Sequence, residues 1–212
     1  MATRVKQSPL KIVSPAVAVD TLIFSVIRGK LRVLLIQIAT GPYVKKWALP
    51  GGLVMMNESL EEAAERVLSE KAGVDGIYLE QLSAFGDPER DMRGRSVSVA
   101  YTALVNSEEF SPKTNDYYSD IAWHDVAHLP PLAFDHREII AYGRQRLESK
   151  LGYSNIAYAL LPREFTLSEL QAVYETILSR AIDKRNFRKK IIEIKLVKET
   201  GKVRSEEHTS EL

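Results

Sequence analysis

The sequence predicts a two-part α/β protein, with a body built on a mixed sheet flanked by helices and a smaller, mainly helical module after it. Two observations lead to this prediction. Segments rich in β-branched residues alternate with amphipathic helical segments over residues 14–151, and residues 153–203 follow the order helix, turn, basic helix, strand. The 212 residues and their 45% hydrophobic content suit one large globular domain with a small appendage.

Strand signals dominate the first half of the body. Residues 16–27 and 31–38 flank Arg28-Gly29-Lys30, which predicts a hairpin, and further strands are expected at 76–85 and 95–105. In the last of these, apolar residues alternate, which predicts a strand with one buried face. The expected buried residues are Val97, Val99, Tyr101, Ala103 and Val105.

Two helices are expected in the body. Ser59 and Glu62 form the sequence pattern of a capping box, a helical apolar stripe follows it, and Gly73 ends the helix. Residues 135–151 form the second expected helix. His124 and His128 lie in a stretch that is typical of a strand end followed by a proline-bearing loop. We therefore interpret them as structural residues and not as metal ligands.

Three absences narrow the class of protein. The chain has no cysteine, which excludes disulfides, thiolate catalysis and zinc-thiolate sites. No apolar run reaches the roughly 18 residues that a membrane span requires. The N-terminal residues lack the core of a signal peptide. We therefore expect a cytoplasmic protein with no membrane partner.

The C-terminal module combines helix signals with a concentrated positive charge. Thr166 and Glu169 form a second capping-box pattern, and Asp183 is expected to cap a further helix, KRNFRKKIIEI. Residues 195–203 then resemble a strand that approaches a hairpin, which is the order of a winged helix-turn-helix. Residues 180–204 hold 10 Lys or Arg against 3 Asp or Glu, whereas residues 1–179 hold 19 against 22. This asymmetry is typical of a segment that binds a polyanion, and it is equally typical of a solvated, charged helix face.

The basic helix has a residue set suited to duplex DNA. Phe187, Ile191 and Ile194 are expected to face inward, and a polar, arginine-rich face lies opposite. Arginine reads guanine edges, asparagine can pair with adenine, and lysine contacts phosphate. The expected DNA-binding residues are Lys184, Arg185, Asn186, Arg188, Lys189 and Lys190.

The segment GLVMMNESLEEAAERVLSEKAGV (52–74) resembles the Nudix box, whose pattern is G-x5-E-x7-R-E-U-x-E-E-x-G-U with U aliphatic. The residues that match in register are Gly52, Glu58, Arg66, Leu68, Glu70, Gly73 and Val74. This resemblance implies the Nudix α/β/α sandwich with a mixed sheet over about residues 14–151.

The resemblance also implies where a Nudix hydrolase would hold Mg²⁺. Carboxylates at positions i, i+3 and i+4 share one helix face and offer this hard ion its oxygen ligands. Here the three positions carry Val67, Glu70 and Lys71, so only the residual Glu70 could ligate. We predict no catalytic residue, no metal site and no resident cofactor. Either the pocket is vestigial, or Lys71 replaces the metal as a partner for a diphosphate, and we favour the second interpretation.

The other ligand-binding candidates lie in the loop GDPERDMRGR. Arg90, Arg93 and Arg95 could form forked hydrogen bonds to phosphate or stack on a base. With Gly52, Glu70 and Lys71 they complete the predicted ligand site. Glu89 and Asp91 could replace the lost metal ligands, which keeps open the alternative of a Mg²⁺-dependent nucleoside-diphosphate hydrolase that cleaves ADP-ribose or a related compound.

The two parts together resemble the Nudix-related transcriptional regulators. The stretches that carry this resemblance are residues 80–105, PLAFDH (131–136), FTLSELQAVYETIL (165–178) and DKRNFRKK (183–190). The family implies a homodimer on a palindromic operator in duplex DNA, released by a small-molecule effector. That effector is ADP-ribose in one branch and a sugar in others, and the sequence leaves the branch open.

The last nine residues, RSEEHTSEL (204–212), resemble the translation of a common sequencing-adapter read. We suspect that they are an artefact and that the return strand of the wing is missing, so the wing is expected to be truncated.

Overall fold

The computed structural model describes residues 14–73, 77, 79–107, 118–193 and 197. It contains a seven-stranded sheet with the central order β3-β2-β1-β6-β5, in which β4 also pairs with β1 and β7 with β2. Only the pairing of β1 with β6 is parallel among these, so the sheet is mixed, as predicted. The strands are β1 (Ala16–Ile27), β2 (Lys30–Ile38), β3 (Trp47–Ala48), β4 (Gly51–Leu53), β5 (Glu80–Phe85), β6 (Ser96–Leu104) and β7 (Tyr118–Asp125).

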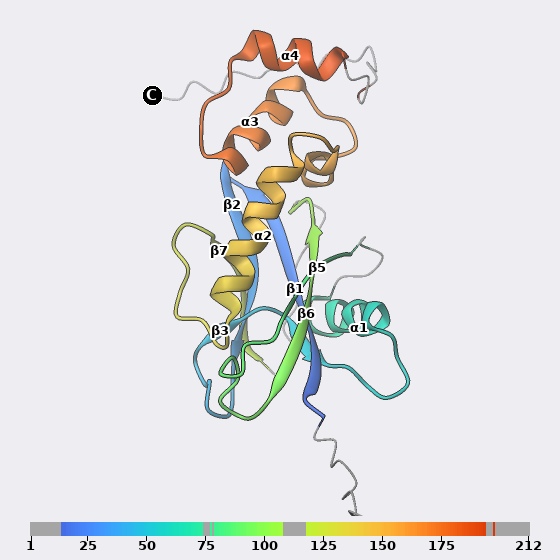
Figure 1. The fold of residues 1–212 in the computed structure, drawn as a ribbon. Coiled ribbons are helices and arrows are strands. Elements are labelled where there is room, and N and C mark those ends of the chain that lie inside the picture. The colour runs from blue at the N-terminus through green and yellow to red at the C-terminus, as the bar shows by residue number, and fades with distance from the viewer. Residues whose placement is uncertain (1–13, 74–76, 78, 108–117, 194–196, 198–212) are drawn as a thin grey trace, which may run out of the picture.

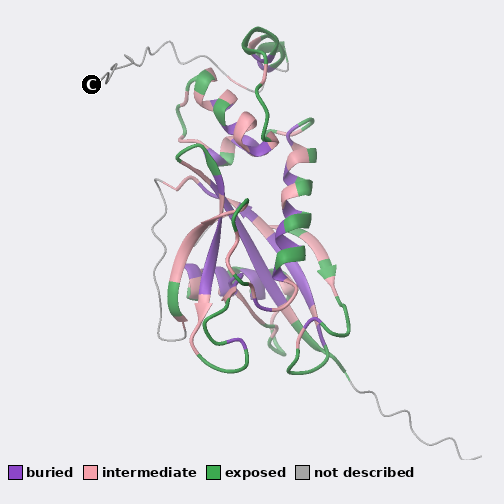
Figure 2. Ribbon diagram, turned by 90° about the vertical axis from the view of Figure 1, so that its left-hand side faces the viewer, coloured by how far each residue is buried: buried purple, intermediate pink, exposed green. Residues whose placement is uncertain are grey.

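Helices cover both faces of this sheet (Figure 1). Helix α1 (Leu60–Ala72) packs on Val19 and Tyr101, and α2 (His136–Lys150) packs on Leu22 and Ala100. Neighbouring residues of one strand point to opposite faces, so β1 and β6 are apolar on both. Figure 2 shows the resulting band of buried strands between the helices.

The prediction that β6 has one buried face is wrong. Ser98 and Ala100 point away from α1 and are nevertheless fully buried, because α2 covers their side of the sheet. The strand expected at 76–85 begins only at Glu80, and residues 74–76 and 78 lie outside the described part of the chain. The hairpin at Arg28-Gly29 is confirmed, with Ile27 paired to Lys30.

Both capping boxes are confirmed. The backbone N–H of Glu62 donates to Ser59 Oγ at 3.1 Å, and that of Ser59 donates to the Glu62 carboxylate at 2.7 Å. Gly73 ends α1 at φ 67°, a left-handed conformation that favours glycine. Thr166 and Glu169 form the same reciprocal pair at the start of α3 (Leu167–Leu178).

The C-terminal module stacks on the end of the sheet that carries the β1–β2 turn and the end of α2 (Figure 1). Its described elements are a 3-10 helix at Ile156–Leu160, α3 and α4 (Lys184–Glu193). The sequence of residues 151–164 has few helix or strand signals and predicts a linker, but the segment is packed, because Ala157 and Leu160 are buried in one core with residues of α2 and α3. The predicted wing, residues 195–203, lies outside the described residues except for Val197.

Candidate functional site

The Nudix-box helix places Val67 where a metal-binding carboxylate would stand in the hydrolase pattern. Val67 is completely buried and packs with Val19, Val99 and Tyr101. A Cβ atom on Gly52 would lie 3.1 Å from a methyl group of Val67 and 3.6 Å from Lys71 Nζ. The glycine therefore lets the β4 backbone approach this face of α1 closely, and an apolar side chain fills the space between them.

Lys71 turns its ammonium group toward the same backbone. Its Nζ donates a hydrogen bond to the Gly51 carbonyl oxygen and lies 5.4 Å from the centre of the Tyr118 ring. Burial lowers the pKa of Lys71, and the nearby carboxylates of Asp20 and Glu70 oppose that shift. An ammonium has three donors, so Lys71 can hold the Gly51 carbonyl and still offer hydrogen bonds to an anion.

Glu58 and Glu70, the two carboxylates that match the Nudix-box pattern, both pair with Arg66. Glu58 receives two hydrogen bonds from the guanidinium of Arg66, at 2.6 and 2.8 Å, and Glu70 forms a looser ion pair with it at 3.4 Å. The hydrogen bonds from Arg66 and from the Met55 backbone lower the pKa of Glu58 to about 2. The pair thus stays ionised at any physiological pH.

This donor set does not fit a magnesium ion. Within the described part of the chain, no group of three or more His, Cys, Asp or Glu is placed to hold a metal. Glu70 is the only one of the three box positions that offers oxygen, and Lys71 brings a positive charge to the same face of α1.

Arg90, predicted to contact a ligand, is placed in a buried cluster. Its guanidinium donates to both oxygens of Asp135, at 2.9 and 2.8 Å, and to Ser96 and Asp20 at 3.2 and 3.3 Å. Arg90 is only 7% exposed, so its hydrogen bonds are used within the fold. These contacts tie the 86–95 loop to the start of α2, and the contact of Arg90 with phosphate stays a prediction.

Arg93 and Arg95 remain at the surface. The guanidinium of Arg93 lies 5.0 Å from the centre of the Phe134 ring and pairs with Asp91 at 2.8 Å. Arg95 donates to the backbone carbonyls of Asp87 and Ser96. Burial acts to raise the pKa of Asp91, but hydrogen bonds from Arg93 outweigh it and lower this pKa. Arg93 therefore offers a stacking surface, whereas Asp91 is already occupied and Glu89 is exposed.

Sequence reasoning missed a buried charged cluster at the start of α2, which we call the α2 anchor. Besides Arg90 and Asp135 it contains Asp20 of β1 and His136 of α2. His136 Nδ1 accepts the backbone N–H of Leu49 at 2.8 Å, and its Nε2 lies 3.4 Å from Asp20 Oδ1. Burial acts to raise the pKa of Asp20, yet His136, Ser98 and Arg90 together lower it. The only sequence signal was an aspartate within the apolar run AVAVDTLIF.

Gly51 leaves room for the Asp20 carboxylate because it has no side chain, so substituting it tests the geometry of the α2 anchor. A Cβ at Gly51 would collide with the Asp20 carboxylate and lie 2.9 Å from the Val19 carbonyl oxygen. We expect Gly51→Ala to destabilise the protein by about 1–3 kcal/mol in urea unfolding, because a backbone atom cannot move aside as a flexible side chain can. Gly86→Ala is the matched control, since its Cβ would meet only ordinary contacts from 3.6 Å outward. Equal stability of both variants would contradict this geometry.

The two histidines lie apart from the Nudix-box helix. His124 belongs to β7 and packs edge-on against Trp47 with ring centres 4.2 Å apart, and burial lowers its pKa. His128 follows β7 in an exposed turn, 3.5 Å from Asp125. These positions fit the structural interpretation.

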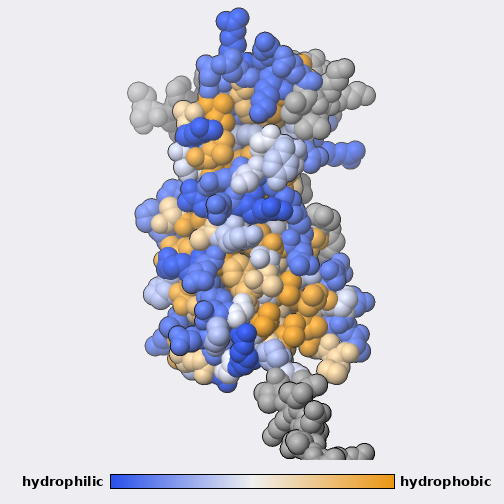
Figure 3. Space-filling view, viewed as in Figure 1, coloured by the Kyte–Doolittle hydropathy of each residue, from blue (hydrophilic) through white to orange (hydrophobic). Residues whose placement is uncertain are grey.

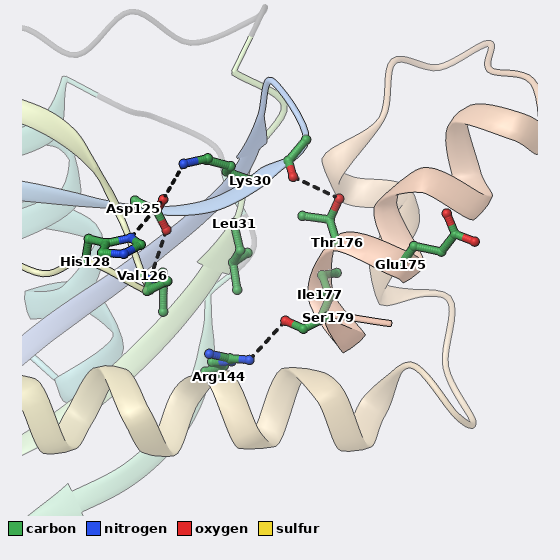
Figure 4. Close-up of a pocket in the computed structure, with 12 residues that line it drawn as sticks. Lys30, Leu31, Asp125, Val126, His128, Arg144, Glu175, Thr176, Ile177 and Ser179 are labelled. Carbon is green, nitrogen blue, oxygen red and sulfur yellow. Dashed lines mark hydrogen bonds and ion pairs between the residues drawn. The ribbon is translucent and has the colours of Figure 1, made fainter. Parts of the chain in front are cut away.

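A cavity of about 380 Å³ lies at the junction of the body and the C-terminal module. It is bounded by the β1–β2 turn, the end of β7, α2 and the C-terminal end of α3 (Figure 4). Two hydrogen bonds border it, from Arg144 to Ser179 Oγ at 3.2 Å and from Thr176 Oγ1 to the Gly29 carbonyl at 3.4 Å. This hollow is therefore distinct from the Lys71 site.

Helix α4 presents the predicted basic face. Asp183 caps the helix by accepting the backbone N–H of Asn186 at 2.8 Å, and Phe187 and Ile191 are buried against α3. Lys184, Arg185, Asn186, Lys189 and Lys190 are exposed. Arg188 is half-buried and donates to Ser168 Oγ at 3.4 Å, so it lies at the edge of the face. Ile194 lies outside the described residues. Figure 3 shows hydrophilic side chains gathered over this end of the molecule.

Comparisons with known proteins agree with this two-part arrangement. Residues 17–143 match the NUDIX domain, and residues 157–210 match the NrtR DNA-binding winged helix domain. The chain is 40% identical over 190 residues to the "ADPR responsive transcriptional repressor NtrR" of Acinetobacter baylyi, covering 88% of this chain and 76% of that one. No helix in the described ranges has the length and apolarity needed to cross a membrane.

Two solved structures are similar as well. The crystal structure of Shewanella oneidensis NrtR complexed with a 27mer DNA aligns with a TM-score of 0.81 and 37% identity, covering 91% of this chain and 90% of that one. The NUDIX domain of the same protein, complexed with ADP ribose, aligns with a TM-score of 0.57 and 36% identity over 67% of this chain and 94% of that one. The chain therefore belongs to the Nudix family, and within it to the proteins that join a Nudix domain to an NrtR-type DNA-binding winged helix domain.

Proposed function

We propose that this protein is a transcriptional repressor that binds operator DNA through α4 and releases it when its Nudix domain binds ADP-ribose. The observation that carries the proposal is Lys71, whose ammonium stands on the Nudix-box helix where hydrolases place a metal-binding carboxylate. The relative that is 40% identical responds to ADP-ribose as a repressor, which supports the choice of effector.

The ligand site in this proposal has a cationic end and a stacking end. Lys71 pairs with the diphosphate but, unlike a metal ion, does not generate hydroxide from bound water. Arg93, stacked on Phe134, offers a flat cationic surface to a base. Gly52, Glu70 and Arg95 are the other residues of the proposed ligand site, whereas Arg90 holds the 86–95 loop in place.

On the DNA side, we propose a homodimer that places two α4 helices in successive major grooves of a palindromic operator. Winged-helix recognition of this kind fits half-sites about one helical turn apart. The protein acts in the cytoplasm in this proposal, where both DNA and nucleotide metabolites are accessible.

An electrophoretic mobility shift on the gene's own upstream region tests the proposal. We expect a discrete complex at physiological salt, displaced by ADP-ribose but not by NAD or a pentose sugar. Equal affinity for the upstream region and for random DNA would overturn the repressor assignment. Release by a sugar alone would overturn the effector assignment.

We expect little or no Mg²⁺-dependent cleavage of ADP-ribose, measured as AMP release at steady state. Val67 offers no oxygen and Lys71 repels a cation, so Glu70, which pairs with Arg66, is the one carboxylate left at the three metal-binding positions of the box. The competing hypothesis is a working hydrolase, and it predicts robust magnesium-dependent turnover that Glu70→Gln abolishes. The double substitution Val67→Glu with Lys71→Glu restores the carboxylates of the hydrolase pattern. It tests whether their loss alone accounts for the missing turnover.

A further inference from the structure

The α2 anchor lies directly beside the site proposed for the effector. Gly51 touches both: its carbonyl accepts the hydrogen bond of Lys71, and its Cα faces the carboxylate of Asp20. The same strand segment is held by His136 through the Leu49 N–H, and by Thr21, which donates to the Pro50 carbonyl at 2.7 and 2.9 Å. A displacement of this segment therefore acts on Asp20 and His136 at once.

Helix α2 extends from this anchor to the C-terminal module. Asp135 stands at its N-cap but makes no side-chain cap hydrogen bond, because its carboxylate is taken up by Arg90. The 15 residues of α2 span about 22 Å at 1.5 Å per residue. Gly143 packs so closely on Leu22 of β1 that a Cβ there would collide with it, so α2 has a tight contact with the sheet at mid-length.

The C-terminal end of α2 packs against the DNA-binding module. Leu147 and Leu151 are buried in the same core as Leu170, Val173 and Ile177. Arg144 reaches across the seam to Ser179, at the end of α3, and Figure 4 shows this bond at the edge of the cavity. The cavity hollows one edge of this seam, where the hydrogen bonds Arg144–Ser179 and Thr176–Gly29 add directional contacts to the packed core.

We propose that Asp135 and Arg90 are positioning residues that couple ligand occupancy beside Lys71 to the orientation of the DNA-binding module, with α2 as the connecting element. This inference rests on the proposed function and adds the route of the response.

In the proposed route, the first movement is that of the Gly51 carbonyl. A diphosphate that binds the Lys71 ammonium pulls it, together with the Gly51 carbonyl to which it stays hydrogen-bonded, and so displaces the Leu49–Gly52 segment. Asp20 and His136 contact that segment, and Arg90 links Asp20 to Asp135 at the start of α2. A rigid helix transmits a small rotation at its anchored end to Arg144 and Leu147, and hence to α3 and α4. A buried, fully paired cluster suits this role because it changes between discrete arrangements instead of deforming gradually.

The experiment measures coupling separately from binding. Operator affinity is determined with and without saturating ADP-ribose, and ADP-ribose affinity is determined on the free protein, for the parent and for Asp135→Asn. Asparagine keeps the size and one acceptor for Arg90 but removes the charge. We expect each single affinity to stay within about threefold of the parent, while operator release by ADP-ribose falls from about hundredfold to below about tenfold. A purely structural role would lower both affinities and leave their coupling intact.

Two further variants complete the test. Arg146→Gln, exposed on the same helix, is the control and should respond like the parent. Arg144→Gln removes the contact to Ser179 near the C-terminal end of α2. We expect this variant to lose coupling as well. If Asp135→Asn fails to fold, Arg144→Gln tests whether α2 couples ligand binding to operator release. If both Asp135→Asn and Arg144→Gln respond fully, the inference is overturned while the proposed function stands. If the parent itself shows no release, both fall.

Discussion

Removing the side chains of Arg185 and Asn186 in the first turn of α4 is expected to abolish specific operator binding. Arg185 is exposed on the helix face opposite Phe187, Asn186 is exposed at the edge of that face, and each has the chemistry to read a base edge. A bidentate base contact contributes about 1–3 kcal/mol of discrimination. The double variant Arg185→Ala with Asn186→Ala should therefore bind the operator at least about thirtyfold more weakly, while its affinity for random DNA falls much less.

The control for this double variant is Arg146→Ala, which removes one positive charge from the surface of α2. It should change operator affinity only slightly, because it lies outside the basic face. Fluorescence anisotropy on operator and random duplexes, at two salt concentrations, separates base reading from phosphate contact. Equal losses on both duplexes would mean that α4 contacts only the backbone.

Replacing Lys71 with alanine is expected to abolish the response to ADP-ribose while leaving operator binding intact. Lys71 is the cation on the Nudix-box face that contacts the Gly51 carbonyl, and it lies in the body, away from α4. A hundredfold release requires that the ligand favour the free form by about 2.7 kcal/mol, and without the lysine that preference should largely vanish.

Titration of the preformed operator complex with ADP-ribose measures this response, and isothermal calorimetry on the free protein measures ligand affinity. Lys71→Arg is the companion variant: it keeps the charge, so partial response is expected from it. If Lys71→Ala responds as the parent does, the sensor role of the altered Nudix helix is wrong, even if ADP-ribose remains the effector.

The sequence by itself determined the local elements whose signals lie within one helical segment. Ser59 with Glu62 and Thr166 with Glu169 locate two helix starts, and Gly73 locates a helix end, because capping involves neighbours three or four residues apart. The spacing of the Nudix box and the charge of α4 are equally local. They were sufficient to predict the family, the mixed sheet and the basic face that the structure presents.

Tertiary structure alone decided which charged residues are free to act. Arg90, Arg93 and Arg95 look alike in sequence, yet only Arg90 meets Asp20 and Asp135, which are 70 and 45 residues away, and becomes buried with them. The same reason explains β6: its second face is buried by α2, an element that follows it in the chain by more than thirty residues. Burial depends on which distant segments the sheet order brings together, and no pattern within a single segment records that order.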